Sequence, residues 1–382
     1  MRNARLKIGL VCPYNITKGG GVQEGILAIR QELAARGHDA KIITPLPRDV
    51  NSDDWPDVIF IGTATDVKSP FATTAQISVS LKNDEIERVL ALEHFDVLHF
   101  HEPWVPMMSR QLLSKSKGVN VATFHARLPD TLMSKTIEAV VTPYTKPLLK
   151  HLDGLTAVSS AAAEYVQGMT SKTITIIPNG INLAKYRGNL QPSISNPESS
   201  ELSKTILFIG RLEKRKGVKY LLKALELVQK QLPDVRLVIA GEGPDRERLE
   251  LLTAQLNLKN VEFKGFVDEA TKMELLKQAD VFCSPALYGE SFGIVLLEAM
   301  AMNVPIVAGD NPGYKAVLQE RGKLSLVNPK NTGAFARRLE IFLEDDELQS
   351  IWCDWASIYV KAFDYPKVVD KYEELYRELL KT

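Results

Sequence analysis

The sequence predicts an α/β protein built from two Rossmann-like domains, and three observations support this prediction. Short β-branched runs alternate with amphipathic helical stretches along the chain, a pattern typical of parallel sheets wound with helices. The chain has 382 residues, which is too long for one ordinary core and suits two domains of roughly 180 residues each. The alternation also starts afresh at Lys204, after a segment with few apolar residues.

Six strands are expected in the first half and five in the second. The first helix should begin after the glycines at 19–21, and a final helix with an apolar stripe should follow Asp364. Residues 187–203 are rich in Asn, Ser and Pro, as exposed loops are, and we place the hinge near Gly180. The expected strands are Lys7 to Cys12, Asp39 to Thr44, Val58 to Gly62, Asp96 to Phe100, Asn120 to Phe124, Gly154 to Val158, Lys204 to Gly210, Val235 to Gly241, Val261 to Gly265, Val281 to Ser284 and Val304 to Ala308.

Composition argues against several classes of protein. The 47 basic and 47 acidic residues balance, so nothing in the net charge indicates a nucleic-acid partner. No uninterrupted apolar run approaches the roughly 18 residues that a membrane-spanning helix needs. The N-terminus leads into a short strand rather than a secretory apolar core, so we expect a cytoplasmic protein. Cys12, Cys283 and Cys353 have no close spacing, and neither a disulfide framework nor a zinc site is predicted.

The most informative motif runs from Gly289 to Glu298. Glu290 should lie on a loop at the carboxyl end of a strand, where open α/β sheets bind ligands, and Glu298 about two turns into the following helix. Gly293 lets backbone N–H groups approach a polar group closely, and the helix expected after Phe292 offers unpaired donors to an anion. We interpret the motif as a phosphate or sugar site that carries two carboxylates.

Three other loops could hold phosphate. The glycines at 19–21 open the first helix, and Gly241 to Gly243 follow a strand of the second half. Neither fits the dinucleotide fingerprint, and a tight strand-to-helix turn explains each equally well. The third loop, Gly210 to Gly217, is basic. Arg211 can clamp a phosphate through two parallel bonds and Lys216 adds a mobile charge, with a solvated loop as the alternative.

The histidines offer a weak metal signal. His99 and His101 should share one face of a strand end with Glu102 close by, but no third ligand is recognisable in the sequence. No Asp-x-Asp motif occurs in the chain. We therefore predict no metal, and expect the negative charge of a bound phosphate to be met by Arg211, Lys216 and helix N-termini.

The stretch from Glu290 to Glu298 resembles the Glu-x7-Glu donor-sugar motif of retaining glycosyltransferases of family 4, and the resemblance extends over nearly the whole chain. It implies the GT-B fold, in which two Rossmann-like domains face each other across a cleft and the last helix crosses back onto the first domain. We expect an acceptor-binding domain of residues 1–180 plus 363–382 and a nucleotide-sugar-binding domain of residues 181–362.

The resemblance also implies roles for individual residues. Glu290 would face the sugar hydroxyls and Glu298 the ribose, Arg211 and Lys216 would hold the diphosphate, and His125 would contact the reacting sugar. The implied catalytic residues are His125, Glu290, Arg211 and Lys216, and the implied donor site contains Gly20, Gly21, Arg211, Lys216, Val267, Glu269, Lys272, Glu290, Ser291, Phe292, Gly293, Ile294 and Glu298.

Within the family, the chain is most similar to bacterial phosphatidylinositol α-mannosyltransferases. In that branch the segment from Val267 to Lys272 lies beside the guanine of GDP-mannose, which makes Val267, Glu269 and Lys272 candidate base contacts. Tyr14, Gln23 and His125 would bind the acceptor. Further matches are Val11 to Tyr14, Gly20 to Gln23, Asp96 to His99, His101 to Pro103, Ala122 to His125 and Ile177 to Gly180.

One departure from this branch concerns the membrane. The helix that carries a basic cluster in those enzymes corresponds to Ser80–Arg88 here, which has charges of both signs, so its attraction to anionic lipid should be weak. Two apolar segments could contact lipid instead, with domain core as the alternative for each. They are Trp104 to Met108 and the stripe formed by Leu132, Met133, Ile137, Val140, Val141, Tyr144 and Leu148.

We expect a metal-independent, retaining hexosyltransferase that moves mannose from GDP-mannose to a lipid or polyol such as phosphatidylinositol, at the inner face of the cell membrane or in the cytoplasm. A UDP-glucose-dependent diacylglycerol glucosyltransferase is the first alternative, and a nucleotide-sugar epimerase the second. A dinucleotide oxidoreductase is disfavoured by the failed fingerprints, and a non-catalytic binding protein by the acidic, basic and phosphate-binding residues present.

Overall fold

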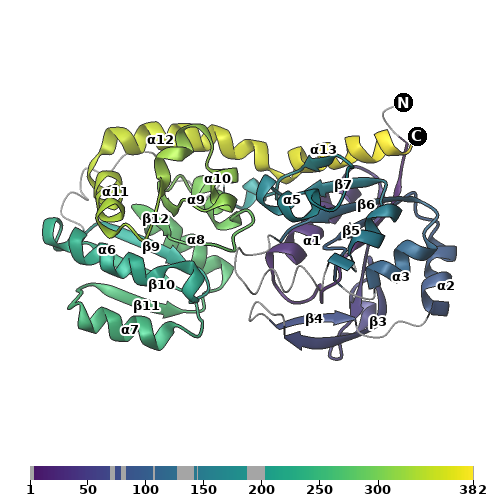
Figure 1. The fold of residues 1–382 in the computed structure, drawn as a ribbon, viewed down its shortest axis with the longest axis horizontal. Helices are drawn as coiled ribbons and strands as arrows, with labels where there is room; N and C mark the ends of the chain where they lie inside the picture. Colours follow the sequence, from purple (N-terminus) through teal and green to yellow (C-terminus); the bar gives the residue numbers. More distant parts are fainter. Residues whose placement is uncertain are drawn as a thin grey trace. The chain divides into compact units, whose positions relative to one another are not determined.

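The computed structural model describes residues 4–68, 74–78, 83–105, 108–126, 142–143, 145–186 and 203–381. The chain divides into two compact units, and each is described by itself (Figure 1). The N-terminal unit comprises Met1–Gly180 and Tyr365–Thr382, and the central unit comprises Ile181–Asp364.

A sheet of eight described strands forms the N-terminal unit, in the order β4-β3-β2-β1-β5-β6-β7-β8. The six strands predicted for this half are confirmed, although β3 extends well beyond Gly62 and pairs antiparallel with β4, which was missed. The other described neighbours pair in parallel. The strands are β1 (Lys7–Val11), β2 (Asp39–Leu46), β3 (Val58–Lys68), β4 (Thr74–Ser78), β5 (Val97–His101), β6 (Val119–Phe124), β7 (Gly154–Ala157) and β8 (Ile174–Ile176).

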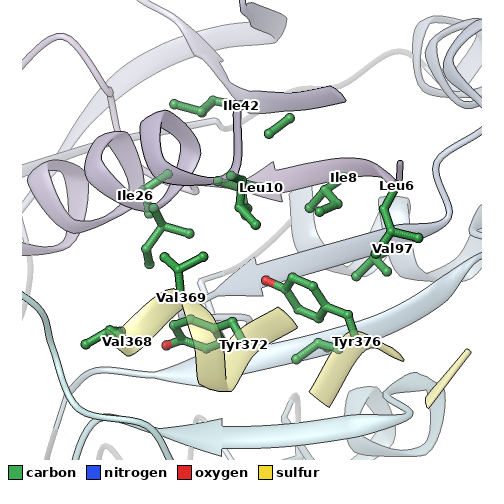
Figure 2. Packing of buried hydrophobic residues seen from close by; sticks show 14 of the residues in the cluster. Leu6, Ile8, Leu10, Ile26, Ile42, Val97, Val368, Val369, Tyr372 and Tyr376 are labelled. Carbon is green, nitrogen blue, oxygen red and sulfur yellow. The ribbon is translucent and has the colours of Figure 1, made fainter. Parts of the chain in front are cut away.

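The last helix, α13 (Tyr365–Leu379), belongs to the N-terminal unit. It buries one stripe, formed by Val368, Val369, Tyr372 and Tyr376, against the core around β1 and α1 (Figure 2). The apolar stripe predicted from the sequence therefore completes the core of the N-terminal unit, whose other elements come from Met1–Gly180. Other helices of this unit that the structure describes over their whole length are α1 (Gly21–Ala35), α2 (Asn83–Glu93), α3 (Met108–Lys115) and α5 (Ser160–Gln167), with short 3-10 turns η1 (Ser52–Asp54) and η2 (Leu149–His151).

The central unit contains a parallel sheet in the order β11-β10-β9-β12-β13-β14. All five predicted strands are confirmed, and only the two-residue β14 was missed. Chain order reverses between β9 and β12, so the loops after these two strands flank the switch point at which open sheets bind ligands. The strands are β9 (Thr205–Ile209), β10 (Arg236–Ala240), β11 (Val261–Gly265), β12 (Val281–Ser284), β13 (Ile306–Gly309) and β14 (Leu326–Val327).

Local caps explain where several helices of the central unit begin. The side chains of Asp268, Asn311, Asn331 and Asp345 each accept a hydrogen bond from a backbone N–H of the first helical turn. The helices are α6 (Val218–Gln231), α7 (Arg246–Gln255), α8 (Glu269–Gln278), α9 (Ile294–Ala301), α10 (Pro312–Val317), α11 (Thr332–Glu344) and α12 (Asp346–Tyr359), with 3-10 turns η3 (Leu183–Lys185), η5 (Lys214–Lys216), η6 (Glu320–Ser325) and η7 (Val360–Phe363).

Some predicted lipid-contact segments lie outside the described residues. Within Ser80–Arg88 the description begins at Asn83, the first residue of α2. Leu148 is described and is buried, 3% exposed, as the core alternative predicts. The undescribed residues of these segments are Ser80, Leu81, Lys82, Pro106, Met107, Leu132, Met133, Ile137, Val140, Val141 and Tyr144. In the part of the chain that the structure describes, no helix is both long and apolar enough to cross a membrane.

Candidate active site

The loops after β9 and β12 are joined by ion pairs around Glu290. Its Oε1 lies 2.7 Å from Arg215 Nη1 and 2.8 Å from Lys216 Nζ. Arg215 Nε in turn lies 2.7 Å from Glu213 Oε2, and Arg211 Nε lies 3.3 Å from Glu213 Oε1. The Glu290 side chain is 11% exposed and that of Arg211 is 52% exposed. Glu290 and Lys216, which the sequence places in the same site, are thus in direct contact, while Arg211 reaches Glu290 only through Glu213 and Arg215.

Arg215 is the residue that the sequence analysis missed. Burial lowers the pKa of its guanidinium, but the ion pairs with Glu290 and Glu213 outweigh burial and raise it above the ordinary value. Arg215 is therefore a fixed cation beside the predicted sugar-binding carboxylate. The available signal was its position in the basic run Lys214–Lys216, which forms the 3-10 turn η5.

Two glycines allow these loops to pack closely against their neighbours. Gly217 has a φ of 73°, and a Cβ there would lie 2.0 Å from the backbone oxygen of Pro285. Gly293 has a φ of 107°, and a Cβ there would lie 2.7 Å from a ring carbon of the buried Tyr314. A side chain at position 217 would separate the two loops, and one at position 293 would push the β12 loop away from Tyr314 on α10. The backbone N–H of Leu287 also donates to the Arg215 carbonyl at 2.8 Å, which links the β12 loop to the basic loop.

Helix α9 begins at Ile294, directly after Gly293. Glu298 therefore lies about one turn into the helix, and the expected two turns are wrong because the chain stays in a loop through Gly293. Phe292 is buried, 4% exposed, with its ring 6.0 Å from that of Phe363, so its side chain belongs to the core. Ser291, Gly293 and Ile294 keep partial exposure.

A second cluster joins α8 to α9. Lys272 Nζ lies 2.7 Å from Glu298 Oε1 and 2.9 Å from Glu269 Oε2. Burial lowers the pKa of Lys272, but Glu298 and then Glu269 raise it above its ordinary value, so the ammonium stays charged. Val267 precedes the helix and is partly buried, and Phe266 beside it is 82% exposed. Lys272 therefore contacts both Glu269 and Glu298, and all three residues are predicted to bind the nucleotide.

In the N-terminal unit, the loop after β1 leads into α1. Gly20 is the N-cap residue of that helix, which begins at Gly21, and no side chain caps it. Gln23 Nε2 donates to the Asn15 carbonyl at 3.5 Å, and a Cβ on Gly20 would lie 2.6 Å from Gln23 Oε1. Gly20, Gly21 and Gln23 are therefore adjacent.

Burial raises the pKa of the Tyr14 hydroxyl well above its ordinary value, with a smaller effect of the Glu102 charge.

His125 directly follows β6. Its Nε2 lies 2.9 Å from His101 Nδ1, and the side chain of Asn179 also hydrogen-bonds the ring. Burial lowers the pKa of His125 to about 4, with the Asn179 bond opposing the shift. The imidazole is therefore neutral near pH 7. Within the described residues, no three side chains of His, Cys, Asp or Glu gather in a way that could hold a metal ion.

Two family models match the chain. The model described as Glycosyltransferase Family 4 matches residues 19–185, and that described as Glycosyl transferases group 1 matches residues 192–354. Among curated relatives, the phosphatidyl-myo-inositol mannosyltransferase of Mycobacterium leprae is 33% identical over 374 residues, which cover 97% of this chain and 96% of the relative. The enzyme of the same name from Mycolicibacterium smegmatis is 32% identical over 364 residues, covering 95% of this chain and 91% of the relative.

Solved structures share the fold at lower identity. A glycosyltransferase from Rickettsia africae aligns with a TM-score of 0.76 at 21% identity, covering 100% of both chains. HepE from Anabaena, in complex with UDP and glucose, aligns with a TM-score of 0.73 at 19% identity, covering 98% of this chain and 100% of the other. Together with the parallel sheets of the two units and the family matches, these likenesses show that the chain belongs to glycosyltransferase family 4 and is a hexosyltransferase with the GT-B fold.

Proposed function

We propose that this hexosyltransferase moves mannose from GDP-mannose to phosphatidylinositol with retention of the anomeric configuration. The proposal rests mainly on the contacts of Lys272 with Glu269 and Glu298. Through these contacts the segment expected at the guanine meets Glu298, the carboxylate expected at the ribose. The two must lie on one surface if they bind the same nucleoside. The names of the two mycobacterial relatives, at 33% and 32% identity, support the same substrates.

The charged cluster around Glu290 suits the departing diphosphate. Arg211, Arg215 and Lys216 contribute three positive charges and Glu213 and Glu290 two negative ones, so the cluster keeps one positive charge in excess. Cations fixed before the reaction stabilise charge that develops in the transition state without further reorganisation. This cluster would take the part that a divalent cation plays in other transferases, and we propose that the enzyme needs no metal.

Glu290 would accept hydrogen bonds from the sugar hydroxyls, because it is an ionised acceptor held in place by two cations. The transition state should resemble an oxocarbenium ion, and the departing phosphate would assist attack from the face that it leaves. On the N-terminal unit, Tyr14, Gln23 and His125 would bind the acceptor and the reacting sugar, with Gly20 and Gly21 beside the donor phosphate.

The acceptor would be reached by peripheral contact with the inner face of the membrane. The described part of α2 carries Asp84, Glu85, Glu87 and Arg88, so electrostatic attraction to anionic lipid should be weak. Each methylene of an acyl chain that is buried contributes about 0.8 kcal/mol, which favours contact through apolar surface. Binding to vesicles should then depend little on salt.

A thermal-shift comparison of GDP, UDP, GDP-mannose and UDP-glucose tests the donor. A nucleotide that binds only the folded protein stabilises it by an amount set by its concentration and affinity, so GDP should stabilise the protein more than UDP. Lys272→Ala should reduce the stabilisation by GDP, whereas Lys223→Ala, an exposed position on α6 of the same unit, should not. Equal or greater stabilisation by UDP would contradict the guanine assignment and favour a UDP-sugar donor.

A further inference from the structure

Two buried imidazoles, His99 and His101, form a connected line from α13 to the partly buried His125. His99 and His101 are both 0% exposed. His99 Nδ1 lies 2.7 Å from the Tyr376 hydroxyl, and its Nε2 lies 2.6 Å from Thr123 Oγ1. The His99 and His101 ring centroids are 4.3 Å apart, and His101 Nδ1 lies 2.9 Å from His125 Nε2. Of the pair that the sequence suggested as weak metal ligands, His101 contacts His125, while both ring nitrogens of His99 bond other side chains.

Glu102 provides a second link to His125. Its Oε1 accepts hydrogen bonds from the backbone N–H groups of His125, at 2.7 Å, and of Ala126, at 2.5 Å. Glu102 is 1% exposed and has a φ of 50°, in the left-handed region that residues other than glycine seldom adopt. Such a backbone conformation is strained and persists only where the surrounding structure enforces it.

The polar atoms of this cluster are costly for the fold. His101 Nε2 and Glu102 Oε2 are buried without a hydrogen-bond partner among the residues that the structure describes. An unsatisfied buried polar atom destabilises the fold, whereas apolar side chains of the same shape would avoid that penalty. Packing alone therefore does not explain why an imidazole and a carboxylate stand here.

We propose that Glu102 and His101 are positioning residues for His125, Glu102 by holding its backbone and His101 by fixing the orientation and tautomer of its ring. The inference rests on the proposed function, in which His125 contacts the reacting sugar. A neutral imidazole has one N–H donor and one acceptor nitrogen, so the bond between the two rings requires that they carry complementary tautomers.

Burial keeps the rings neutral, which this arrangement needs. It lowers the pKa of His101 well below its ordinary value, and the neighbouring His99 and His125 add to the shift. Burial also raises the pKa of Glu102 to about 8, although the two backbone donors oppose the change. With His101 on one ring nitrogen and the Asn179 side chain also bonding the ring, His125 would hold a defined orientation and tautomer.

The first experiment compares His101→Phe with the wild type. Phenylalanine has nearly the shape of the imidazole but cannot hydrogen-bond His125, so the fold should persist while the His125 tautomer changes. We would measure the ¹⁵N shifts of the His125 ring nitrogens, assigned with a His125→Gln variant, and the kcat and KM of transfer. The ring shifts should change, and kcat should fall on the order of 10²-fold with the donor KM near wild type. His151→Phe, at an exposed position, is the matched control.

The second experiment uses Glu102. Glutamine keeps an oxygen that can accept from the two backbone N–H groups, so Glu102→Gln should retain most of the kcat that Glu102→Ala loses. Equal losses in both variants would contradict the positioning role of Glu102. If His101→Phe fails to fold by circular dichroism, His101→Leu replaces it, because leucine also cannot hydrogen-bond the His125 ring and should change the ring shifts in the same way.

Unchanged His125 shifts together with wild-type kcat in His101→Phe would overturn the role of His101. The ring shifts are measured without substrate, so they separate this inference from the proposed function. If His101→Phe alters the His125 shifts but the wild-type enzyme transfers nothing from GDP-mannose, the positioning role is supported and the donor assignment is rejected.

Discussion

Arg215 and Glu290 form the ion pair that connects the two loops at the switch point of the central sheet, with 2.7 Å between Nη1 and Oε1. Lys216 holds the same carboxylate oxygen at 2.8 Å. Glu290 is therefore oriented before any ligand binds, and its charge is balanced by two cations. This arrangement makes the carboxylate and the basic loop one functional unit rather than two separate motifs.

Replacing Glu290 by Gln should leave the fold intact and lower transfer roughly 10- to 100-fold. The amide keeps the shape, but a hydrogen bond to a charged group contributes about 1.5–3 kcal/mol, much of which is lost. Single-turnover rates beside circular dichroism spectra would check this, with Glu347→Gln, at an exposed position on α12, as the control. Transfer at the wild-type rate would mean that Glu290 serves only the scaffold.

Arg215→Ala should lower kcat on the order of 10²-fold, as the loss of one preorganised donor does. The arginine both orients Glu290 and supplies positive charge, so Arg211→Ala and Lys216→Ala should have effects of similar size. Lys214→Ala, an exposed neighbour in the same turn, should stay near wild type. Steady-state kinetics of the four variants would measure these changes in kcat. Equal rates for Arg215→Ala and Lys214→Ala would contradict the role of Arg215.

Acid should destabilise the N-terminal unit through His99. Burial and then the charge of His125 lower its pKa from 6.5 to about 3, and its ring faces Tyr376, Tyr372 and His101. The unfolded chain therefore takes up a proton near pH 6.5 and the folded chain only near pH 3, so the free energy of unfolding falls as the pH is lowered through this window.

His99→Gln should flatten this acid dependence, which denaturation midpoints between pH 4 and 7 would measure. Glu102, with a pKa raised to about 8, acts with the opposite sign, since the unfolded carboxylate binds its proton less readily. The difference between wild type and His99→Gln isolates the histidine, and His151→Gln is the exposed control. Identical pH profiles for wild type and His99→Gln would contradict this account.

Removal of divalent cations should leave transfer unchanged. The excess positive charge of the cluster around Glu290 would stabilise the departing diphosphate without a metal. Activity would be followed after EDTA treatment and after adding Mg²⁺ back. A loss with EDTA that Mg²⁺ restores would show that the cluster alone is not sufficient.

Periodicity located the strands of both sheets because buried parallel strands are continuous apolar runs. It missed β4, which carries few apolar residues, and it missed β8 and β14 because Ile174–Ile176 and Leu326–Val327 are short and β8 is largely exposed. Motif spacing predicted that Glu290 and Lys216 lie on loops after strands of the switch point, as they do, whereas the family resemblance pointed to Lys272, which lies on α8 after the edge strand β11.

Side-chain pairing could not be predicted in the same way. Arg215 is one of three adjacent basic residues, and only the 3-10 turn decides which of them faces Glu290. The support of His125 by His101 and Glu102 depends on the parallel register of β5 and β6, which sequence patterns do not specify.

The most direct test of the central claim is a transfer assay analysed by mass spectrometry of the lipid product. Purified protein would be incubated with phosphatidylinositol, diacylglycerol or free inositol, and with either GDP-mannose or UDP-glucose. The account predicts one added hexose on phosphatidylinositol with GDP-mannose, and little product from UDP-glucose with any acceptor. Transfer from UDP-glucose to diacylglycerol, with none from GDP-mannose, would contradict it.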